Sequence, residues 1–300
     1  MAHAAGVRLP FEKVPAAVRA WVERVLGSTV VSAATQQGGF SPGVAARLVT
    51  ASGRRAFVKT VGTALNEKTP SLFRQEIEAV EAIGTLPSAP RLLDVYDDGD
   101  WVGLLFEDIE GRLPSHPWIQ SEADRVLAAL DELTDALDPS PWPDAPVVAV
   151  RSRDFLSRWP VIIADGLAVP DWLEGRVEEL AELSRAALEV MASGKALAHY
   201  DLRADNIILT DDRVVFIDWA HPGLGPRWTD TVILQADMRD SPIRLPALPD
   251  DPAITGFVAA IAGGQWWGAA QEAPPGLPTI RAWQREQALV HLDWVRERLG

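Results

Sequence analysis

The chain has 300 residues, of which 47% are hydrophobic, and it carries a formal net charge of −14 at pH 7. It contains no cysteine, which excludes disulfide bonds and thiolate metal sites, and its negative charge argues against binding to nucleic acid or anionic membranes. No apolar run approaches membrane-spanning length, and the N-terminus lacks a signal-peptide core. We therefore expect a soluble cytoplasmic protein, long enough for two lobes, that binds neither nucleic acid nor membranes.

The first predicted elements are an amphipathic helix and two strands joined by a glycine-rich loop. The helix covers residues 14–26 and ends at Gly27, and the strands cover residues 29–36 and 44–50. The loop between the strands contains Gly38-Gly39-Phe40-Ser41-Pro42-Gly43. Glycines in a strand–loop–strand setting let backbone N–H groups approach phosphates, although a plain hairpin gives the same pattern.

One lysine lies inside an apolar strand. The third predicted strand covers residues 56–60 and contains Lys59, whereas the other three lysines of the chain lie outside such strands. A lysine in a strand can simply discourage aggregation at a sheet edge.

The next predicted helix carries a glutamate on its apolar face. It begins at Thr69-Pro70 and ends before Gly84. At about 100° per residue, Glu76 falls near the middle of the apolar stripe, whereas Glu78 points the opposite way. A carboxylate on a buried face is costly unless it is paired, so we expect Glu76 to meet Lys59. The alternative is a boundary position at which Glu76 leans into water.

Two further strands are predicted before the pattern breaks. They cover residues 91–96 and 101–106, with Asp97-Asp98-Gly99-Asp100 as the turn between them. The segment Glu107-Asp108-Ile109-Glu110-Gly111 then fits neither a strand nor a helix. It reads either as a connection between lobes or as an ordinary surface loop.

The remainder of the chain is predicted to be mainly helical. Expected helices cover residues 122–137, 154–164, 172–191, 231–238, 253–262 and 280–299. Ser121 and Asp171 are the expected N-caps of the first and third of these helices. We expect packing roles, rather than a ligand cage, for Trp266, Trp267, Trp283 and Trp294.

A group of polar residues surrounds a short predicted hairpin within this helical part. The hairpin strands cover residues 207–209 and 214–217; Asp201 and Asn206 precede them, and Asp218 follows directly. Polar groups at the ends of apolar strands are held rigidly. Two carboxylates and a carboxamide suit a hard cation such as Mg²⁺, which prefers oxygen ligands and leaves room for phosphates. The alternative is a hairpin whose Asp and Asn residues serve only as caps and turns.

The pattern His199-x-Asp201-Leu202-x-x-x-Asn206, followed by a strand and Asp218, resembles the catalytic loop and metal-binding aspartate of the kinase superfamily. The Gly38-Gly39-x-Ser41 loop is similar to that of the aminoglycoside phosphotransferase family, the small-molecule kinases of this superfamily. The resemblance implies an α+β, protein-kinase-like fold with an antiparallel five-stranded N-lobe over residues 1–110. A mainly helical C-lobe with the catalytic loop and the acceptor site would cover residues 111–300.

The resemblance also implies roles for individual residues. Asp201 would be the catalytic base that takes the proton of the acceptor hydroxyl, and Asn206 and Asp218 would hold Mg²⁺. Lys59, paired with Glu76, would contact the α- and β-phosphates of ATP. The remaining nucleotide contacts would come from the glycine-loop residues Gly39 and Ser41 and from backbone groups near Glu107 and Ile109, which would hydrogen-bond adenine.

The chain also departs from protein kinases at several positions. Tyr200 stands where protein kinases carry an arginine, Asp218 is followed by Trp219-Ala220 instead of Phe-Gly, and no Ala-Pro-Glu segment follows. These departures argue against a regulated protein kinase. Tyr200 also differs from the glycine common in antibiotic kinases, which leaves the acceptor open.

We therefore expect an enzyme that transfers the γ-phosphoryl group of ATP to a hydroxyl of a small molecule. Acidic residues such as Asp237, Asp240 and Glu174 either attract an amine-bearing acceptor or form solvated faces. An aminoglycoside-like cationic acceptor is the leading expectation, with antibiotic resistance as the function, and a neutral metabolite or natural product is the alternative. A nucleotide-binding pseudokinase is a second hypothesis. A third is a metallohydrolase with His199, Asp201, Asp218 and His221 as ligands.

Overall fold

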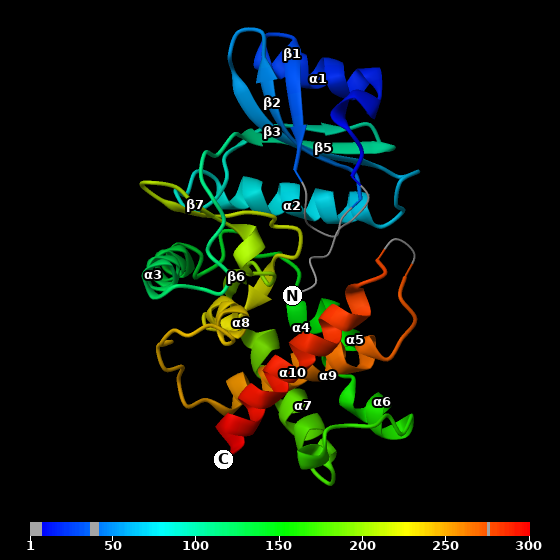
Figure 1. The fold of residues 1–300 in the computed structure, drawn as a ribbon, viewed down its shortest axis with the longest axis vertical. Coiled ribbons are helices and arrows are strands. Elements are labelled where there is room, and N and C mark those ends of the chain that lie inside the picture. The colour runs from blue at the N-terminus through cyan, green and yellow to red at the C-terminus, as the bar shows by residue number, and fades with distance from the viewer. Residues whose placement is uncertain (1–7, 37–41, 275–276) are drawn as a thin grey trace. The chain divides into compact units, whose positions relative to one another are not determined.

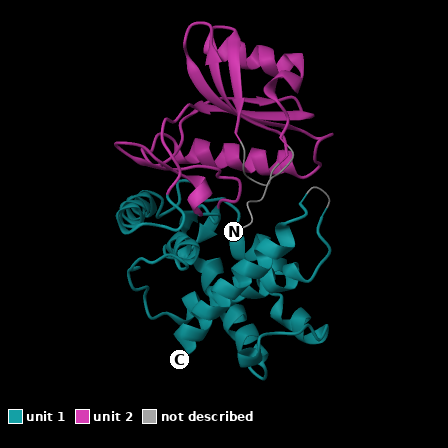
Figure 2. Cartoon of the chain, viewed as in Figure 1, with its two compact units in different colours: residues 1–2, 115–202, 223–300 teal, residues 3–114, 203–222 magenta. Residues whose placement is uncertain are grey.

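The computed structural model describes residues 8–36, 42–274 and 277–300. The chain forms two compact units, shown in different colours in Figure 2. Unit 1 contains Ser115–Leu202 and Gly223–Gly300, and unit 2 contains Arg203–Pro222 together with the described residues up to Pro114. Each unit has its own hydrophobic core.

Unit 2 is built on an antiparallel sheet with the strand order β1-β2-β3-β5-β4. Its strands are β1 (Val30–Thr35), β2 (Val44–Thr50), β3 (Arg55–Gly62), β4 (Leu92–Asp97) and β5 (Trp101–Glu107). The five predicted strands are therefore confirmed, with ends within two residues of those expected. β1 and β4 form the edges, so Lys59 on β3 lies in the centre of the sheet and not at an edge.

One face of this sheet packs against helix α1 (Ala16–Leu26), which lies along it in Figure 1. The amphipathic pattern explains the packing, because Val18, Trp21, Val22 and Leu26 are all buried. Even-numbered residues of β3, such as Ala56 and Val58, belong to the same core. Because side chains alternate along a strand, the odd-numbered residues of β3, among them Lys59, point to the other face.

That other face is crossed by helix α2 (Thr69–Ile83) (Figure 1). The helix begins and ends as the sequence predicts, with Pro70 in its first turn. Its first turn is capped by Asn66, whose Oδ1 accepts hydrogen bonds from the backbone N–H groups of Lys68 and Thr69, each at 2.9 Å. The apolar stripe of α2 buries Phe73, Val80 and Ile83, and it also buries Glu76.

The hairpin of β7 (Ile207–Leu209) and β8 (Val214–Phe216) also belongs to unit 2, although the predicted boundary at residue 110 placed it in the helical lobe. Backbone hydrogen bonds explain the difference. The N–H of Phe216 donates to the Ser88 carbonyl at 2.9 Å, and Leu209 and Arg112 exchange hydrogen bonds in both directions. The short 3₁₀ helices η1 (Phe11–Lys13) and η3 (Ala204–Asn206) complete the unit.

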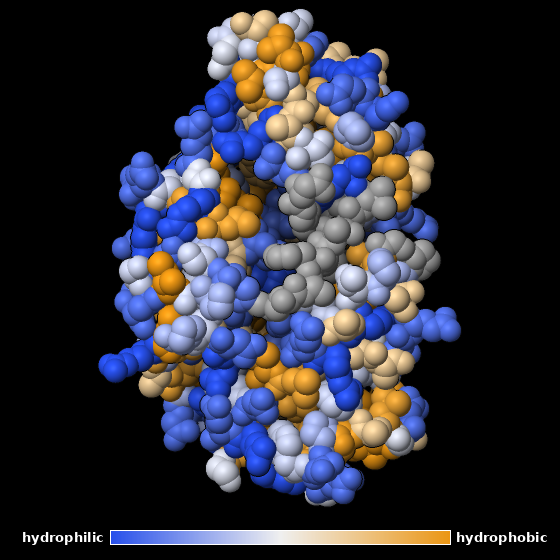
Figure 3. Space-filling view, in the orientation of Figure 1, coloured by the Kyte–Doolittle hydropathy of each residue, from blue (hydrophilic) through white to orange (hydrophobic). Residues whose placement is uncertain are grey.

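Unit 1 is mainly helical, as expected. Its α-helices are α3 (Gln120–Ala136), α4 (Val148–Arg151), α5 (Arg153–Leu156), α6 (Trp159–Ala164), α7 (Val177–Ser193), α8 (Thr229–Met238), α9 (Pro252–Ala269) and α10 (Ile280–Leu299). Its core gathers residues of α7, α9 and α10, and α9 is buried along nearly its whole length. No helix of the described residues is long and apolar enough to span a membrane. On the face viewed in Figure 3, hydrophilic residues surround separate small groups of hydrophobic ones.

Several details of the helical prediction are wrong. The helix expected over residues 253–262 extends to Ala269 as α9. The helix expected over residues 154–164 is divided into α5 and α6, with Pro160 in the first turn of α6. The helix expected from residue 172 starts instead at Val177, after the 3₁₀ helix η2 (Asp171–Leu173), because Gly175 adopts a φ of 77°. Neither Ser121 nor Asp171 makes the expected side-chain cap.

Of the four tryptophans expected to have packing roles, Trp266, Trp267 and Trp294 lie against arginine side chains. Trp266 and Trp294 are buried, and arginine side chains cover three rings: Arg285 lies 3.5 Å from the centroid of Trp266, Arg158 lies 3.9 Å from Trp267, and Arg239 lies 4.8 Å from Trp294. Guanidinium stacking of this kind stabilises a helical core at its boundary with water.

The loop that carries Asp201 is anchored by a buried carboxylate on α8. Asp230 is 6% exposed, and its two oxygens accept hydrogen bonds from the backbone N–H groups of His199 (2.7 Å) and Tyr200 (2.9 Å). The loop follows β6 (Ala196–Ala198), which pairs with β9 (Gly223–Gly225). Burial raises the pKa of Asp230 to about 6, although the two hydrogen bonds lower it.

Replacing Asp230 with asparagine is expected to destabilise the protein. A carboxylate offers two acceptors, whereas asparagine would turn an NH₂ group toward one of the two backbone N–H groups and leave buried donors unsatisfied. We expect a loss of roughly 1–3 kcal/mol in the free energy of unfolding, measured with urea. The exposed Asp240→Asn in the same unit is the control and should change little.

The size of this loss should depend on pH. Because the folded-state pKa of Asp230 is raised above the unfolded value, its contribution to stability falls as the pH rises from about 4 to about 6. The asparagine side chain of the variant does not titrate, so the difference between the wild type and Asp230→Asn should be larger at about pH 4.5 than at about pH 7. A difference that is constant over this range would contradict the raised pKa.

Candidate active site

The central feature of unit 2 is a lysine shared by two carboxylates. Lys59 Nζ lies 2.6 Å from Glu76 Oε2 on α2 and 2.6 Å from Asp218 Oδ1, which follows β8. The side chains of Lys59 and Glu76 are 13% and 1% exposed, whereas that of Asp218 is 38% exposed. Three residues separated by up to 159 positions in the chain therefore meet at one ammonium group.

Burial and charge compete in this group. Burial lowers the pKa of Lys59, but Asp218 and Glu76 outweigh that effect and raise it, so the ammonium keeps its charge. Burial raises the pKa of Glu76 to about 7 despite the neighbouring ammonium. Of the two carboxylates, Asp218 is the more exposed, whereas Glu76 is fully buried beside the ammonium.

Asn206 and Asp218 lie at neighbouring ends of the β7–β8 hairpin. The backbone N–H of Ile217 donates to the Asn206 carbonyl at 2.9 Å, so residues 206 and 217 face each other across the hairpin. The two side chains offer one carboxamide and one carboxylate, which are hard oxygen donors that fit Mg²⁺. Within the described part of the chain, no group of three or more His, Cys, Asp or Glu residues is placed to hold a metal ion. The donor set therefore fits a cation that takes its other ligands from phosphates and water.

Two candidate-site positions have unusual backbone conformations. Among the described residues, Tyr200 (φ 66°) and Asp218 (φ 65°) are the non-glycine residues with positive φ. Such conformations are costly and are found where the surroundings enforce them, often at functional sites. At Tyr200 the enforcing group is Asp230, and Gly225 provides the space, since a Cβ there would lie 2.5 Å from the Tyr200 hydroxyl oxygen. A positive φ favours glycine, so a tyrosine at position 200 depends on these neighbours.

Asp201 itself is half-buried in unit 1. Its backbone N–H donates to Nδ1 of the fully buried His199 at 3.2 Å, so His199 supports the loop. That nitrogen accepts a backbone hydrogen bond, which argues against the metallohydrolase hypothesis in which His199 is a metal ligand.

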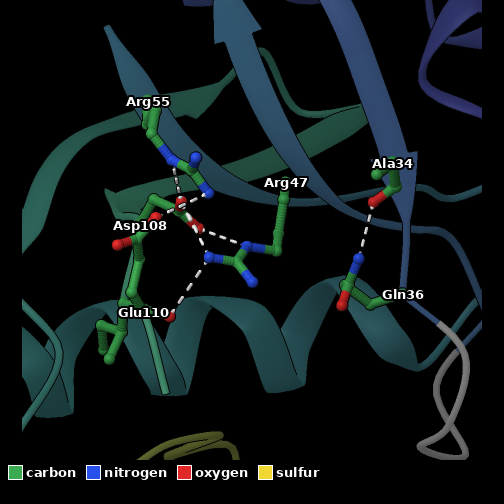
Figure 4. A network of polar contacts seen from close by, with 7 residues as sticks. Ala34, Gln36, Arg47, Arg55, Asp108 and Glu110 are labelled. Carbon is green, nitrogen blue, oxygen red and sulfur yellow. Dashed lines mark hydrogen bonds and ion pairs between the residues drawn. The ribbon is translucent and has the colours of Figure 1, made fainter. Parts of the chain in front are cut away.

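The segment after β5 is held by charged side chains, shown in part in Figure 4. Glu107 Oε1 accepts from Arg213 at 3.0 Å and from the backbone N–H of Arg91 at 3.2 Å. Asp108 is bound by Arg47 and Arg55, and Arg55 also lies 3.2 Å from Glu110. We call Arg47, Arg55, Asp108 and Glu110 the Asp108 cluster. The side chains of Glu107 and Asp108 therefore connect this segment to β2, β3 and the β7–β8 turn.

The predicted phosphate-contacting residues Gly39 and Ser41 lie outside the described residues. The end of the loop is described at Gly43, which has a φ of 123°. A Cβ at Gly43 would lie 2.6 Å from the Thr60 carbonyl oxygen, so only glycine fits this close approach of the loop to β3.

Sequence reasoning missed three residues. Phe57 is half-buried on the same face of β3 as Lys59. The alternation of side chains along a strand could have placed Phe57 on that face from the sequence. Arg8 interacts electrostatically with Asp218, and burial lowers the pKa of Arg8. Asp230 had no sequence signal, because it lies far beyond Asp201 in the chain and reaches the loop only through the fold.

Comparisons with known proteins identify the architecture. The sequence model of the phosphotransferase enzyme family matches residues 37–267, and no curated protein sequence matches the chain. A thermostable mutant of aminoglycoside phosphotransferase APH(4)-Ia, solved with ADP and hygromycin B, is 15% identical, with 95% of this chain and 99% of that chain covered and a TM-score of 0.60.

Two further structures have the same fold. The amicoumacin kinase hAmiN, solved with AMP-PNP, Ca²⁺ and Ami, is 13% identical; 89% of this chain and 88% of that chain are covered, with a TM-score of 0.51. Choline kinase from Cryptosporidium parvum Iowa II is 11% identical, with coverages of 91% and 89% and a TM-score of 0.51. At such identities the likeness shows the fold, and the expected kinase-like architecture is confirmed. Since the family model matches well over half of the chain, the protein belongs to the phosphotransferase enzyme family.

Proposed function

We propose that the protein is an ATP-dependent kinase that moves the γ-phosphoryl group to a hydroxyl of a small molecule. The observation that carries the proposal is the Lys59–Glu76–Asp218 group. In this group a buried ammonium is held at the centre of the five-stranded sheet of unit 2. Phosphoryl transfer needs such fixed positive charge, because it depends on positioning and charge stabilisation. Membership of the phosphotransferase family supports the same reaction.

In this proposal the residues of unit 2 bind the nucleotide. Lys59 contacts the α- and β-phosphates while Glu76 holds its ammonium in place. Gly39 and Ser41 approach the phosphates through their loop, and backbone groups of Glu107 and Ile109 hydrogen-bond the base. Phe57, which is half-buried on the Lys59 face, offers a flat apolar surface on which a purine can stack.

Asn206 and Asp218 are the proposed ligands of Mg²⁺. A bound Mg²⁺ would neutralise phosphate charge and orient the γ-phosphoryl group. Lys59 already contacts Asp218, so the same carboxylate links the ammonium to the metal position. Only two side-chain donors come from the protein, so the ion would bind appreciably only together with a nucleotide.

Asp201 is the proposed catalytic base. It accepts the proton of the acceptor hydroxyl as the new O–P bond forms, and the bond between the γ-phosphorus and the bridging oxygen breaks to release ADP. Its loop is fixed by Asp230 and His199, which suits a group that must be held in position.

The acceptor class is the least determined part of the proposal. Of the three acidic residues singled out in unit 1, Asp237 accepts a hydrogen bond from the indole N–H of Trp118 at 3.0 Å, whereas Asp240 and Glu174 are exposed. The net charge of −14 favours a cationic acceptor through long-range attraction. We therefore propose an amine-bearing polyol of the aminoglycoside kind, acted on in the cytoplasm as a resistance function.

Asp201→Asn should lower kcat by roughly 10²–10⁴-fold, the span expected when a positioned base is lost. The affinity for ATP should stay nearly unchanged, because Asp201 contacts the acceptor and not the nucleotide. Turnover is measured as ADP release, and Asp211→Asn in the exposed β7–β8 turn is the control. Full activity of Asp201→Asn would remove this residue from the mechanism; a wild type that binds nucleotide without any turnover would favour a pseudokinase.

Lys59→Met and Glu76→Gln should each weaken nucleotide binding, and the double variant should lose less than the sum of the two. The reason is that Glu76 acts on the nucleotide through Lys59, to which it is bonded at 2.6 Å. A coupling of roughly 0.5–3 kcal/mol is expected in a calorimetric double-mutant cycle with ADP and Mg²⁺. Glu78→Gln, on the exposed face of α2, is the control. Strict additivity would show that the pair does not act as a unit.

An ATP-consumption screen over aminoglycosides, amino alcohols and neutral sugars tests the acceptor. If the acceptor is cationic, its KM should rise with salt, because screening weakens long-range attraction to the acidic protein. The screen is therefore repeated at two salt concentrations, with the KM for ATP followed in parallel. Turnover of neutral compounds alone, insensitive to salt, would exclude the cationic acceptor and leave the kinase function intact.

A further inference from the structure

The Asp108 cluster joins two strands of the sheet to the segment that follows β5. Arg47 on β2 donates from Nε to Asp108 Oδ1 at 2.6 Å and from Nη2 to Oδ2 at 3.0 Å. Arg55 on β3 donates from Nε to Oδ2 at 2.7 Å. Figure 4 shows the two guanidinium groups on either side of the one carboxylate. Such a paired, bidentate contact fixes orientation as well as distance.

The carboxylate in this contact is buried. The Asp108 side chain is 4% exposed, whereas those of Arg47 and Arg55 are 31% and 45% exposed. Burial would raise the pKa of Asp108, but the hydrogen bonds from both arginines outweigh it and hold that pKa below its ordinary value. Asp108 therefore stays charged, and removing an arginine would leave a buried carboxylate short of a partner.

Arg47 also contacts the backbone of the segment directly. Its Nη2 lies 3.5 Å from the Ile109 carbonyl oxygen, at the limit of a hydrogen bond. Arg47 lies opposite Phe57 in the β2–β3 register, and Ala45, two residues earlier, lies opposite Lys59. Because side chains two apart on a strand share a face, Arg47 is on the face of the sheet that carries Phe57 and Lys59.

The neighbouring acidic side chain is held from a different direction. Glu107 bonds to Arg213, which follows the β7–β8 turn, and to the backbone N–H of Arg91. Consecutive carboxylates at positions 107 and 108 are thus held by arginines from separate elements. This leaves the backbone of residues 107–109 little freedom to rotate.

We propose that Arg47 and Asp108 are positioning residues for the nucleobase, which hold the backbone of Glu107 and Ile109 in the orientation that binds the purine edge. The inference rests on the proposed function, since it assigns the base of the nucleotide to this segment. Lys59 and Glu76 act on the phosphates, whereas the Asp108 cluster acts only on the base. Losing Arg47 should therefore weaken the binding of ligands that contain a base and leave the binding of ligands without a base unchanged.

The test compares ADP with inorganic tripolyphosphate, which carries phosphates but no base. Calorimetric binding of each, with Mg²⁺, is measured for the wild type and for Arg47→Met. We expect the Kd of ADP to rise about three- to tenfold, the equivalent of one hydrogen bond, and the Kd of tripolyphosphate to change less than about twofold. In turnover, the KM for ATP should rise while kcat stays unchanged.

Two further variants separate positioning from stability. Arg74→Met removes another bidentate arginine–aspartate pair of unit 2, with Asp97, and should leave both Kd values unchanged. Arg47→Lys keeps the charge but cannot make the bidentate contact with Asp108. Its ADP affinity should therefore lie between those of Arg47→Met and the wild type. It also gives a second measurement if Arg47→Met does not fold, which a thermal melt reveals.

The outcomes are distinct. A loss of affinity for ADP without a matching loss for tripolyphosphate supports the inference. Two results would overturn the inference and leave the proposed function standing, provided that the wild type binds both ligands. In the first, the Arg47 variants bind ADP with the Kd of the wild type. In the second, their affinities for ADP and tripolyphosphate fall by the same factor. If the wild type binds neither ligand, the proposed function fails and the inference fails with it.

Discussion

The arrangement of unit 2 depends on one buried ammonium group. Lys59 on the central strand β3 is satisfied only when α2 brings Glu76 and the end of β8 brings Asp218. Each partner alone would be costly to bury, so the sheet, the crossing helix and the hairpin are linked by the same charge. This contact adds to the backbone hydrogen bonds that join the hairpin, although it is distant in sequence, to the compact unit of the sheet.

A second constraint acts on the loop of unit 1. Asp230 accepts hydrogen bonds from two consecutive backbone N–H groups and holds Tyr200 at a positive φ. The phenol packs into the helical core against Phe257, with ring centroids 6.4 Å apart, and this burial offsets the backbone strain. A tyrosine therefore occupies a position that favours glycine, and the loop keeps its form through packing.

Charged side chains serve structure as well as chemistry in this chain. Asp108, Glu107 and Asp230 are carboxylates that fix backbone segments, whereas Asp218 keeps one side exposed next to the ammonium of Lys59. Arginines on three tryptophan rings have a similar structural role in unit 1, where stacking covers the helical core. Several acidic residues of the chain thus form ion pairs with basic residues that are far away in the sequence.

The sequence by itself determined the five strands, the crossing helix and the meeting of Lys59 with Glu76, because alternation and helical periodicity report which side chains face inward. It did not determine the roles of Asp230, Arg47 or Asp108, whose partners lie far from them along the chain and leave no local pattern. It also missed the place of the hairpin in unit 2 and the breaks at Pro160 and Gly175. Local periodicity encodes secondary structure and burial, whereas long-range ion pairs and the assignment of a hairpin to one unit are decided only when distant backbone groups hydrogen-bond.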